Sequence, residues 1–284
     1  MRNDRSFGAN TAQQLTQRVH GSTVDEFLST GGFRLWIVYP ITGVLETQRK
    51  HHTSGGIPLS HNDTRRPTAL VVVSHHRTDS LTAHIARRTV AQLEATGHRV
   101  DLLDLHAEGF DPRMNVADQP DWNDREKPYS PEVEDHMRRV LAADLIITVF
   151  PIYWAYVPAL LKGWIDRVWN YGFAYGRSKS RLAGKRMLWI GLAGATADDA
   201  IIPAIHTMLD TQLSGGIAYY CGLSDSKIAV LPDAEERPQR LDSAGNLEIG
   251  EAISGAARDT HYADFERKVA DHITNFLAAD RIPA

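Results

Sequence analysis

The segment Phe150-Pro151-Ile152-Tyr153-Trp154-Ala155-Tyr156-Val157-Pro158-Ala159-Leu160-Leu161-Lys162-Gly163-Trp164 joins a buried strand to a helix. It continues the apolar run Leu145–Phe150, which is typical of a parallel strand buried on both faces. Pro151 has no N–H to donate and is expected to end the strand, and Pro158 suits the first residue of a helix. The aromatic residues between the prolines therefore lie on a short loop. Such loops, at the carboxyl ends of parallel strands, bind ligands in open α/β sheets, and flat rings suit a flat ligand.

Strands and helices alternate from Thr68 onward. Apolar, often β-branched runs predict five strands, at Ala69–Val73, Val100–Leu105, Leu145–Phe150, Met187–Leu192 and Ser226–Leu231. Helical spacing of apolar residues predicts a helix capped by Ser80, a second over about Pro131–Ala142, a third with Leu160, Leu161 and Trp164 in its core stripe, and a last over about Asp259–Ala278. This alternation predicts a doubly wound α/β domain.

Residues 1–67 differ from the rest of the chain in composition and periodicity. They show no sustained periodicity and are rich in Thr, Gln, Ser, Gly and His, so we expect a poorly structured N-terminal extension before a domain spanning 68–284. Phe33–Tyr39 could form a short strand or an interfacial anchor, although a patch that packs on the domain or is not selected for structure is the favoured interpretation. The polar stretch Asp111–Tyr129 is long for a plain connector and is either a functional loop or an excursion.

Composition excludes several classes of function. The net charge of −4 gives no electrostatic reason to expect nucleic acid as a partner, and no apolar run predicts a membrane span or a signal peptide. The single cysteine, Cys221, excludes an internal disulfide and fits a reducing cytoplasm; it is expected in a buried, unreactive turn. The pairs His51-His52 and His75-His76 lack a full set of ligands, so no metal site is predicted.

Two further loops follow predicted strands. In the stretch Ser74–Thr82, a helix begins directly after a strand, and its free N–H groups and dipole favour an anion such as phosphate. The glycines of a Rossmann fingerprint or P-loop are missing there, and an ordinary capped turn is an equal alternative. In the stretch Leu192–Thr196, small residues would let backbone N–H groups approach a ligand. With the aromatic loop, these stretches converge on one edge of the sheet.

Several segments resemble the flavodoxin-like NAD(P)H:quinone oxidoreductases, a group that includes mammalian quinone reductases, bacterial modulators of drug activity and ancillary reductases of potassium efflux systems. The resemblance covers roughly residues 68–280 and is carried by Ala69–His75, the aromatic segment after Pro151, Val157–Trp164, Gly172–Gly176 and Leu182–Lys185. It implies a flavodoxin-like sheet of five parallel strands in the order 2-1-3-4-5, with helices on both faces.

The same resemblance implies a flavin, with FAD favoured and FMN as the alternative, and a homodimer with the active site at the interface. It assigns the flavin phosphates to four residues, His75, Ser80, Leu81 and Thr82. It assigns the isoalloxazine ring to Pro151, Ile152, Tyr153 and Trp154 on one side and to Leu192, Ala193 and Gly194 on the other.

Mammalian members of the group use a tyrosine and a nearby histidine to assist hydride transfer. Here the corresponding segment, Thr196–Ala200, contains no tyrosine, and the candidates that remain are Tyr156 and His206. The expected reaction takes a hydride from NADH or NADPH and passes it through the flavin to a quinone or similar aromatic acceptor, with ping-pong kinetics. The alternatives are a flavodoxin-type electron carrier and a flavin-binding regulatory subunit of a membrane potassium-efflux transporter.

Overall fold

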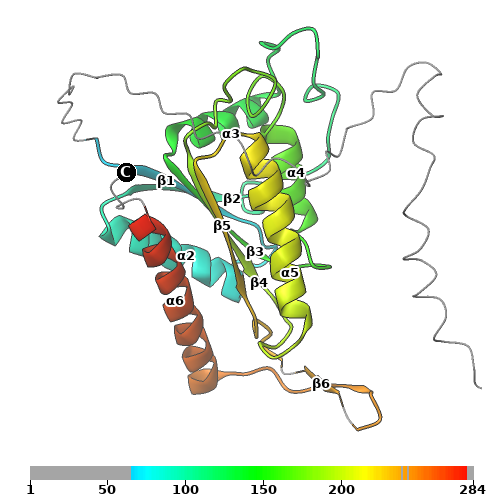
Figure 1. The fold of residues 1–284 in the computed structure, drawn as a ribbon. Helices are drawn as coiled ribbons and strands as arrows, with labels where there is room; N and C mark the ends of the chain where they lie inside the picture. The colour runs from blue at the N-terminus through cyan, green and yellow to red at the C-terminus, as the bar shows by residue number, and fades with distance from the viewer. Residues whose placement is uncertain (1–64, 238, 242, 280–284) are drawn as a thin grey trace, which may run out of the picture. The chain divides into compact units, whose positions relative to one another are not determined.

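The computed structural model describes residues 65–237, 239–241 and 243–279, and its centre is a five-stranded parallel sheet (Figure 1). The strand order is β2-β1-β3-β4-β5, as the resemblance implies. The strands are β1 Thr68–Val73, β2 Arg99–Asp104, β3 Leu145–Pro151, β4 Arg186–Leu192 and β5 Asp225–Leu231. The predicted extension 1–67, including Phe33–Tyr39, lies almost wholly outside the described residues and stays a prediction.

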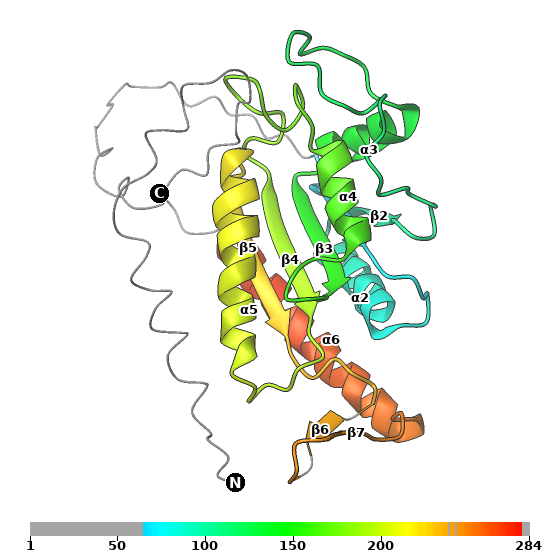
Figure 2. The ribbon, with the colours of Figure 1, turned by 90° about the vertical axis from the view of Figure 1, so that its right-hand side faces the viewer.

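Helices cover both faces of the sheet, which confirms the doubly wound class (Figures 1 and 2). One face packs against α3 Pro131–Ala142, α4 Ala159–Val168 and α5 Ile201–Leu209, and the other against α2 Leu81–Ala95 and α6 Gly255–Ala278. No helix within the described ranges is long and apolar enough to cross a membrane.

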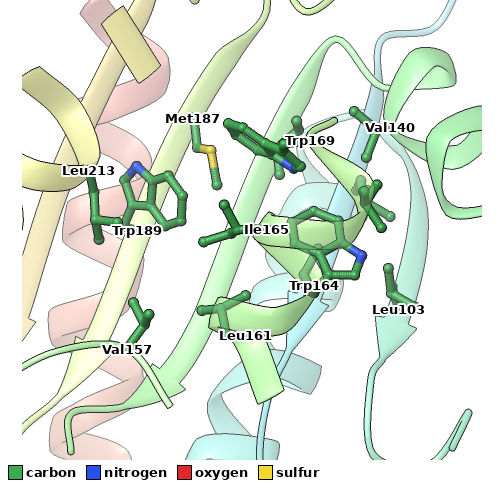
Figure 3. Close-up of a cluster of buried hydrophobic side chains, with 14 of the residues drawn as sticks. Leu103, Val140, Val157, Leu161, Trp164, Ile165, Trp169, Met187, Trp189 and Leu213 are labelled. Carbon is green, nitrogen blue, oxygen red and sulfur yellow. The ribbon is translucent and has the colours of Figure 1, made fainter. Parts of the chain in front are cut away.

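Strand β3 is buried on both faces, which explains its continuous apolar sequence. Ile146 and Phe150 belong to the core under α3–α5, whereas Ile147 and Val149 face the core under α2 and α6. Three indoles fill the first of these cores: the Trp169 ring lies 6.1 Å from both Trp164 and Trp189, between α4 and the sheet (Figure 3). Leu161 and Trp164 are therefore core residues, as predicted.

The structure corrects several element boundaries. Pro158 is the N-cap of α4 with extended backbone (φ −61°, ψ 153°), so the helix begins one residue later than predicted. Helix α6 begins at Gly255, because Ser254 rather than a later residue is its N-cap. Strand β3 includes Pro151 as its last residue, paired with Leu192 of β4. Proline can occupy this place because the N–H that it lacks would lie beyond the hydrogen bonds of the ladder.

The segment between β4 and β5 and the segment before α6 contain elements that were not predicted. Helix α5 follows β4 and continues as a π-helix, η1, over Asp210–Ala218, and a hairpin of β6 Gln239–Leu241 and β7 Leu247–Ile249 precedes α6. A π-helix bonds i→i+5, so its apolar residues do not repeat at the usual helical spacing, and Gly215 and Gly216 disfavour a helix further. The hairpin strands are only three residues long, too short to show alternation.

A buried ion pair anchors the polar stretch Asp111–Tyr129 to the helical layer. The Arg167 side chain, 2% exposed, donates to Asp118 Oδ2 from Nη2 at 2.7 Å, and its Nη1 lies 2.8 Å from Glu132 Oε2. Burial acts to raise the pKa of Asp118, but the Ser130 N–H and the Arg167 guanidinium outweigh burial and lower it. This stretch forms turns held by its contacts with α3 and α4.

The Asp118→Ala substitution is expected to lower the free energy of unfolding by about 3–5 kcal/mol, because it leaves the buried Arg167 without its main counter-charge. Urea unfolding followed by circular dichroism measures the change. The matched control is Asp135→Ala, which removes an exposed pair with Arg138 and should cost at most about 1 kcal/mol. Equal losses in the two variants would contradict the anchoring role of Arg167.

Candidate functional site

Three loops meet at the carboxyl ends of β1, β3 and β4, as predicted. These strands are neighbours in the sheet, and each loop makes one further backbone hydrogen bond to the next strand beyond the end of its own strand. The Ser74 N–H donates to Val149 O at 3.1 Å, the Ile152 N–H to Leu192 O at 2.8 Å, and the Ala193 N–H to Leu231 O at 2.8 Å. Because the loops leave the sheet in register, they lie side by side at one edge.

The aromatic loop after β3 is a two-residue turn with strained backbone. Tyr153 and Tyr156 exchange both backbone hydrogen bonds at 3.0 Å, while Trp154 (φ 51°) and Ala155 (φ 59°) are both left-handed. Positive φ at both central residues is the pattern of a type I′ turn, which normally selects Asn-Gly. Each non-glycine residue in this region costs about 1–2 kcal/mol. Strain of this kind clusters at functional sites.

The strained turn presents aromatic surface to solvent. The Trp154 side chain is 100% exposed and Tyr153 is 46% exposed, whereas Tyr156 is half-buried against the core. Burial raises the pKa of Tyr153, and the charge of Glu235 adds to the rise. The exposed rings of the turn are therefore available to a ligand.

Ser80 caps helix α2, as predicted, and this use of its hydroxyl competes with the donation to a phosphate that the resemblance implies. Its Oγ donates to Arg77 O at 2.9 Å and accepts from the Ala83 N–H at 3.1 Å, so the side chain caps α2. Within the described part of the chain, the N–H groups of Leu81 and Thr82 make no hydrogen bond. Thus the first turn of α2 offers an anion two backbone donors and the positive end of its dipole.

His75 lies beside this helix start and is half-buried. Its Nδ1 accepts the Arg77 N–H at 3.0 Å, and its ring stacks on His76 with centroids 4.5 Å apart. Burial lowers the pKa of His75, and the neighbouring His76 lowers it further. His75 is therefore held in one orientation and favours the neutral form.

A cavity of about 270 Å³, which the sequence analysis did not anticipate, lies between the starts of α2 and α6. Arg258 lines it, donating to Asp79 O at 3.1 Å and to the Tyr262 hydroxyl at 2.8 Å, and Glu236 holds its Nε at 3.3 Å. Arg87 lines the same cavity. Sequence reasoning missed Arg258 because the predicted helix began at Asp259, one residue after it. The approach of Arg258 to the start of α2 also depends on tertiary packing, which no local pattern shows.

The loop after β4 is more crowded than small residues suggest. Ala193 uses its N–H on Leu231 and its carbonyl on the Ala234 N–H, so it has no backbone donor to spare. Glu235 covers Gly194, since a Cβ at Gly194 would lie 2.7 Å from the Glu235 carboxylate oxygen. Glu235 is thus a second residue that sequence reasoning missed, and it lies against this loop at Gly194.

The two catalytic candidates are not brought together by any hydrogen bond among the described residues. Burial raises the pKa of Tyr156, and Asp166 adds to the rise. His206 is exposed on α5, and the group it influences is His272 of α6: burial mainly lowers the pKa of His272, and His206 lowers it further. Cys221 is buried, and burial raises its thiol pKa to about 12, which makes it a poor nucleophile.

These features fit a ligand that combines a flat ring with phosphate. The carboxyl edge supplies a strained aromatic turn, two unpaired N–H groups at the start of α2 and the guanidinium of Arg258 on α6. Ser74, at the end of β1, adds a buried hydroxyl that has no hydrogen-bond partner among the described residues. A buried polar atom of this kind ordinarily needs a partner, and a bound ligand or water supplies one.

Comparison with known proteins agrees with this geometry. A family model described as a flavodoxin-like fold matches residues 67–253. The chain therefore belongs to the flavodoxin-like fold family.

Similar proteins narrow the class of enzyme to which the chain belongs. An uncharacterized NAD(P)H oxidoreductase, YcaK, of Escherichia coli is 36% identical over 161 residues, covering 57% of this chain and 81% of that protein. Ribosyldihydronicotinamide dehydrogenase [quinone] of Mus musculus is 29% identical over 176 residues, covering 54% of this chain and 76% of that protein. The predicted membership in the NAD(P)H:quinone oxidoreductase group, and the enzyme class of oxidoreductase, are confirmed.

A solved structure shares the fold. An NAD(P)H:quinone oxidoreductase from Methanothermobacter marburgensis superposes with a TM-score of 0.57 over 73% of this chain and 97% of that one. Its sequence identity is 19%, so this likeness concerns the fold alone.

The strain in the aromatic turn predicts an unusual response to glycine. Ala155→Gly should raise the free energy of unfolding by about 0.5–1 kcal/mol, because glycine adopts positive φ without a Cβ clash. Ala91→Gly, at an exposed position inside α2, should lower the same quantity by about 1 kcal/mol. Chemical denaturation of both variants measures the contrast, and a loss of stability in Ala155→Gly would show that the turn is not left-handed in solution.

Proposed function

We propose that this protein binds FAD at the carboxyl edge of its sheet and passes a hydride from NADH or NADPH to a quinone or similar aromatic acceptor. The observation that supports the proposal most is the strained, exposed aromatic turn beside a helix start with unpaired donors. Relatives named as NAD(P)H and ribosyldihydronicotinamide dehydrogenases of quinones point to the same reaction.

The chain would hold the phosphates at the start of α2. The N–H groups of Leu81 and Thr82 donate there, with His75 at the side, while Ser80 keeps the helix start in place through its cap. Arg258 provides a positive charge in the adjacent cavity of about 270 Å³. That additional room favours FAD over FMN, because FAD has a second phosphate and an adenosine to accommodate.

The ring system would lie against the aromatic turn. Pro151–Trp154 forms one wall and Leu192–Gly194 the other, and Glu235 must leave the face of Gly194 if the ring is to approach its backbone. Bound flavin supplies the hydride chemistry, so the protein needs to bind, orient and exclude water rather than provide a nucleophile. Both co-substrates would use the same exposed surface in turn, which gives ping-pong kinetics.

A second copy of the chain completes the proposal. Trp154 is fully exposed in the single chain, and a homodimer with the site at its interface would cover that ring. The cytoplasm remains the predicted compartment, on the ground of the single cysteine.

The test begins with an absorbance spectrum of the purified protein and mass analysis of the released cofactor. We expect flavin bands and the mass of FAD, and steady-state consumption of NADPH with a soluble quinone. A protein whose absorbance and melting temperature are unchanged by added FAD or FMN would refute the flavin site. Bound flavin with no NADPH consumption would favour the electron carrier, and co-purification with a membrane protein at negligible turnover would favour the regulatory subunit.

Arg258→Ala is expected to weaken FAD binding by about tenfold or more, since a charge-assisted hydrogen bond contributes about 1.5–3 kcal/mol. The loss for FMN should be smaller, because FMN lacks the part that would enter the cavity. Fluorescence titration of flavin-free protein measures both affinities. Arg267→Ala, on the exposed side of the same helix, is the control and should change neither. Equal losses for FAD and FMN would argue against adenosine in the cavity.

A further inference from the structure

Glu235 is an exposed acid that neither the fold nor the proposed phosphate site uses. Its carboxylate lies against Gly194, on the loop that would form one wall for a flavin ring. A Cβ at Gly194 would lie 2.7 Å from Glu235 Oε1 and 2.8 Å from Glu235 Cγ. Among the residues that the structure describes, this carboxylate makes no hydrogen bond and no ion pair. Its negative charge is therefore uncompensated at the edge of the proposed ring site.

The backbone on both sides of Glu235 is held in place. Before it, the Ala234 N–H donates to Ala193 O at 2.9 Å, which ties the loop after β5 to the loop after β4. After it, the Glu236 carboxylate accepts from Arg258 Nε at 3.3 Å. When a ring arrives, the Glu235 side chain can turn aside by rotating about its own bonds. Because its backbone is fixed, the carboxylate stays beside the ring.

The charge of Glu235 also acts on the aromatic turn. Burial raises the pKa of Tyr153 on that turn, and the charge of Glu235 adds to the rise. Gly194 and Tyr153 belong to the two loops proposed as the opposite walls of the ring site. A ring held between these walls would therefore lie in the field of the same carboxylate. The neighbouring acid, Glu236, differs in this respect because Arg258 neutralises it.

A flavin ring gains negative charge when it accepts a hydride. NADH or NADPH is oxidised to the nicotinamide cation, and the neutral ring takes up its two electrons and one proton, which leaves the ring with one negative charge. The ring becomes neutral again when the hydride passes to a quinone, which takes one further proton from water. A fixed negative charge beside the ring repels the charge of the reduced state, and such charges tune the electronics of a cofactor.

We propose that Glu235 lowers the reduction potential of the bound flavin and so makes the reduced flavin a stronger hydride donor. The proposal rests on the proposed function, since it concerns the ring that would lie between the two loops. It adds a consequence for the substrate: a lower potential extends the acceptors to quinones and similar aromatic molecules that are harder to reduce.

Redox titration of the flavin-loaded protein against reference dyes, followed by flavin absorbance, measures the potential without any turnover. Glu235→Gln keeps the size of the side chain and removes its charge, and Glu235→Lys reverses the charge. We expect the potential to rise in the order Glu, Gln, Lys. The first step should be at least about a tenfold change in the equilibrium constant, which is about 30 mV for a two-electron couple. High salt should narrow the differences by screening.

Glu251→Gln is the matched control, because it removes an exposed acid from the segment that precedes α6 and should leave the potential unchanged. Equal potentials in the flavin-loaded wild type and both Glu235 variants, or potentials that do not follow the charge, would overturn this proposal and leave the proposed function standing. A wild-type protein that binds no flavin would refute the proposed function, and this proposal with it.

Discussion

Burial of β3 on both faces is the constraint on which the candidate site depends. The strand pairs with β1 and β4, and its side chains enter both cores, so its end at Pro151 is fixed. Helix α4, which follows, is fixed at its other end by the buried pair of Arg167 with Asp118. The turn between them is therefore held at both ends. That is why Trp154 and Ala155 can remain left-handed at a cost of about 1–2 kcal/mol each.

The resulting site relies on backbone and surface rather than on reactive side chains. Its donors are the free N–H groups at the start of α2, its apolar surface is the strained turn, and its positive charge is Arg258. Tyr156 and His206 share no hydrogen bond, and Cys221 is buried with a raised thiol pKa. An arrangement of this kind positions a cofactor that carries its own chemistry, which is consistent with the oxidoreductase family.

The sheet was predictable from sequence because buried parallel strands are continuous apolar runs, as in Leu145–Phe150. The convergence of the three loops followed from strand order. By contrast, the cover of Gly194 by Glu235 and the approach of Arg258 to α2 depend on contacts between distant segments, whereas the Ser80 cap is local and was predicted. The π-helix was missed for a local reason: i→i+5 bonding removes the periodicity by which helices are found.

The two edges of a parallel α/β sheet differ electrostatically, and this explains the place of the candidate site. Helices that follow strands begin at the carboxyl edge, where α2 turns its positive dipole end and free N–H groups toward a ligand. At the amino edge, helices end and present carbonyl oxygens, which repel anions. A ligand that carries phosphate is therefore favoured at the carboxyl edge, where the start of α2 also lies near Arg258.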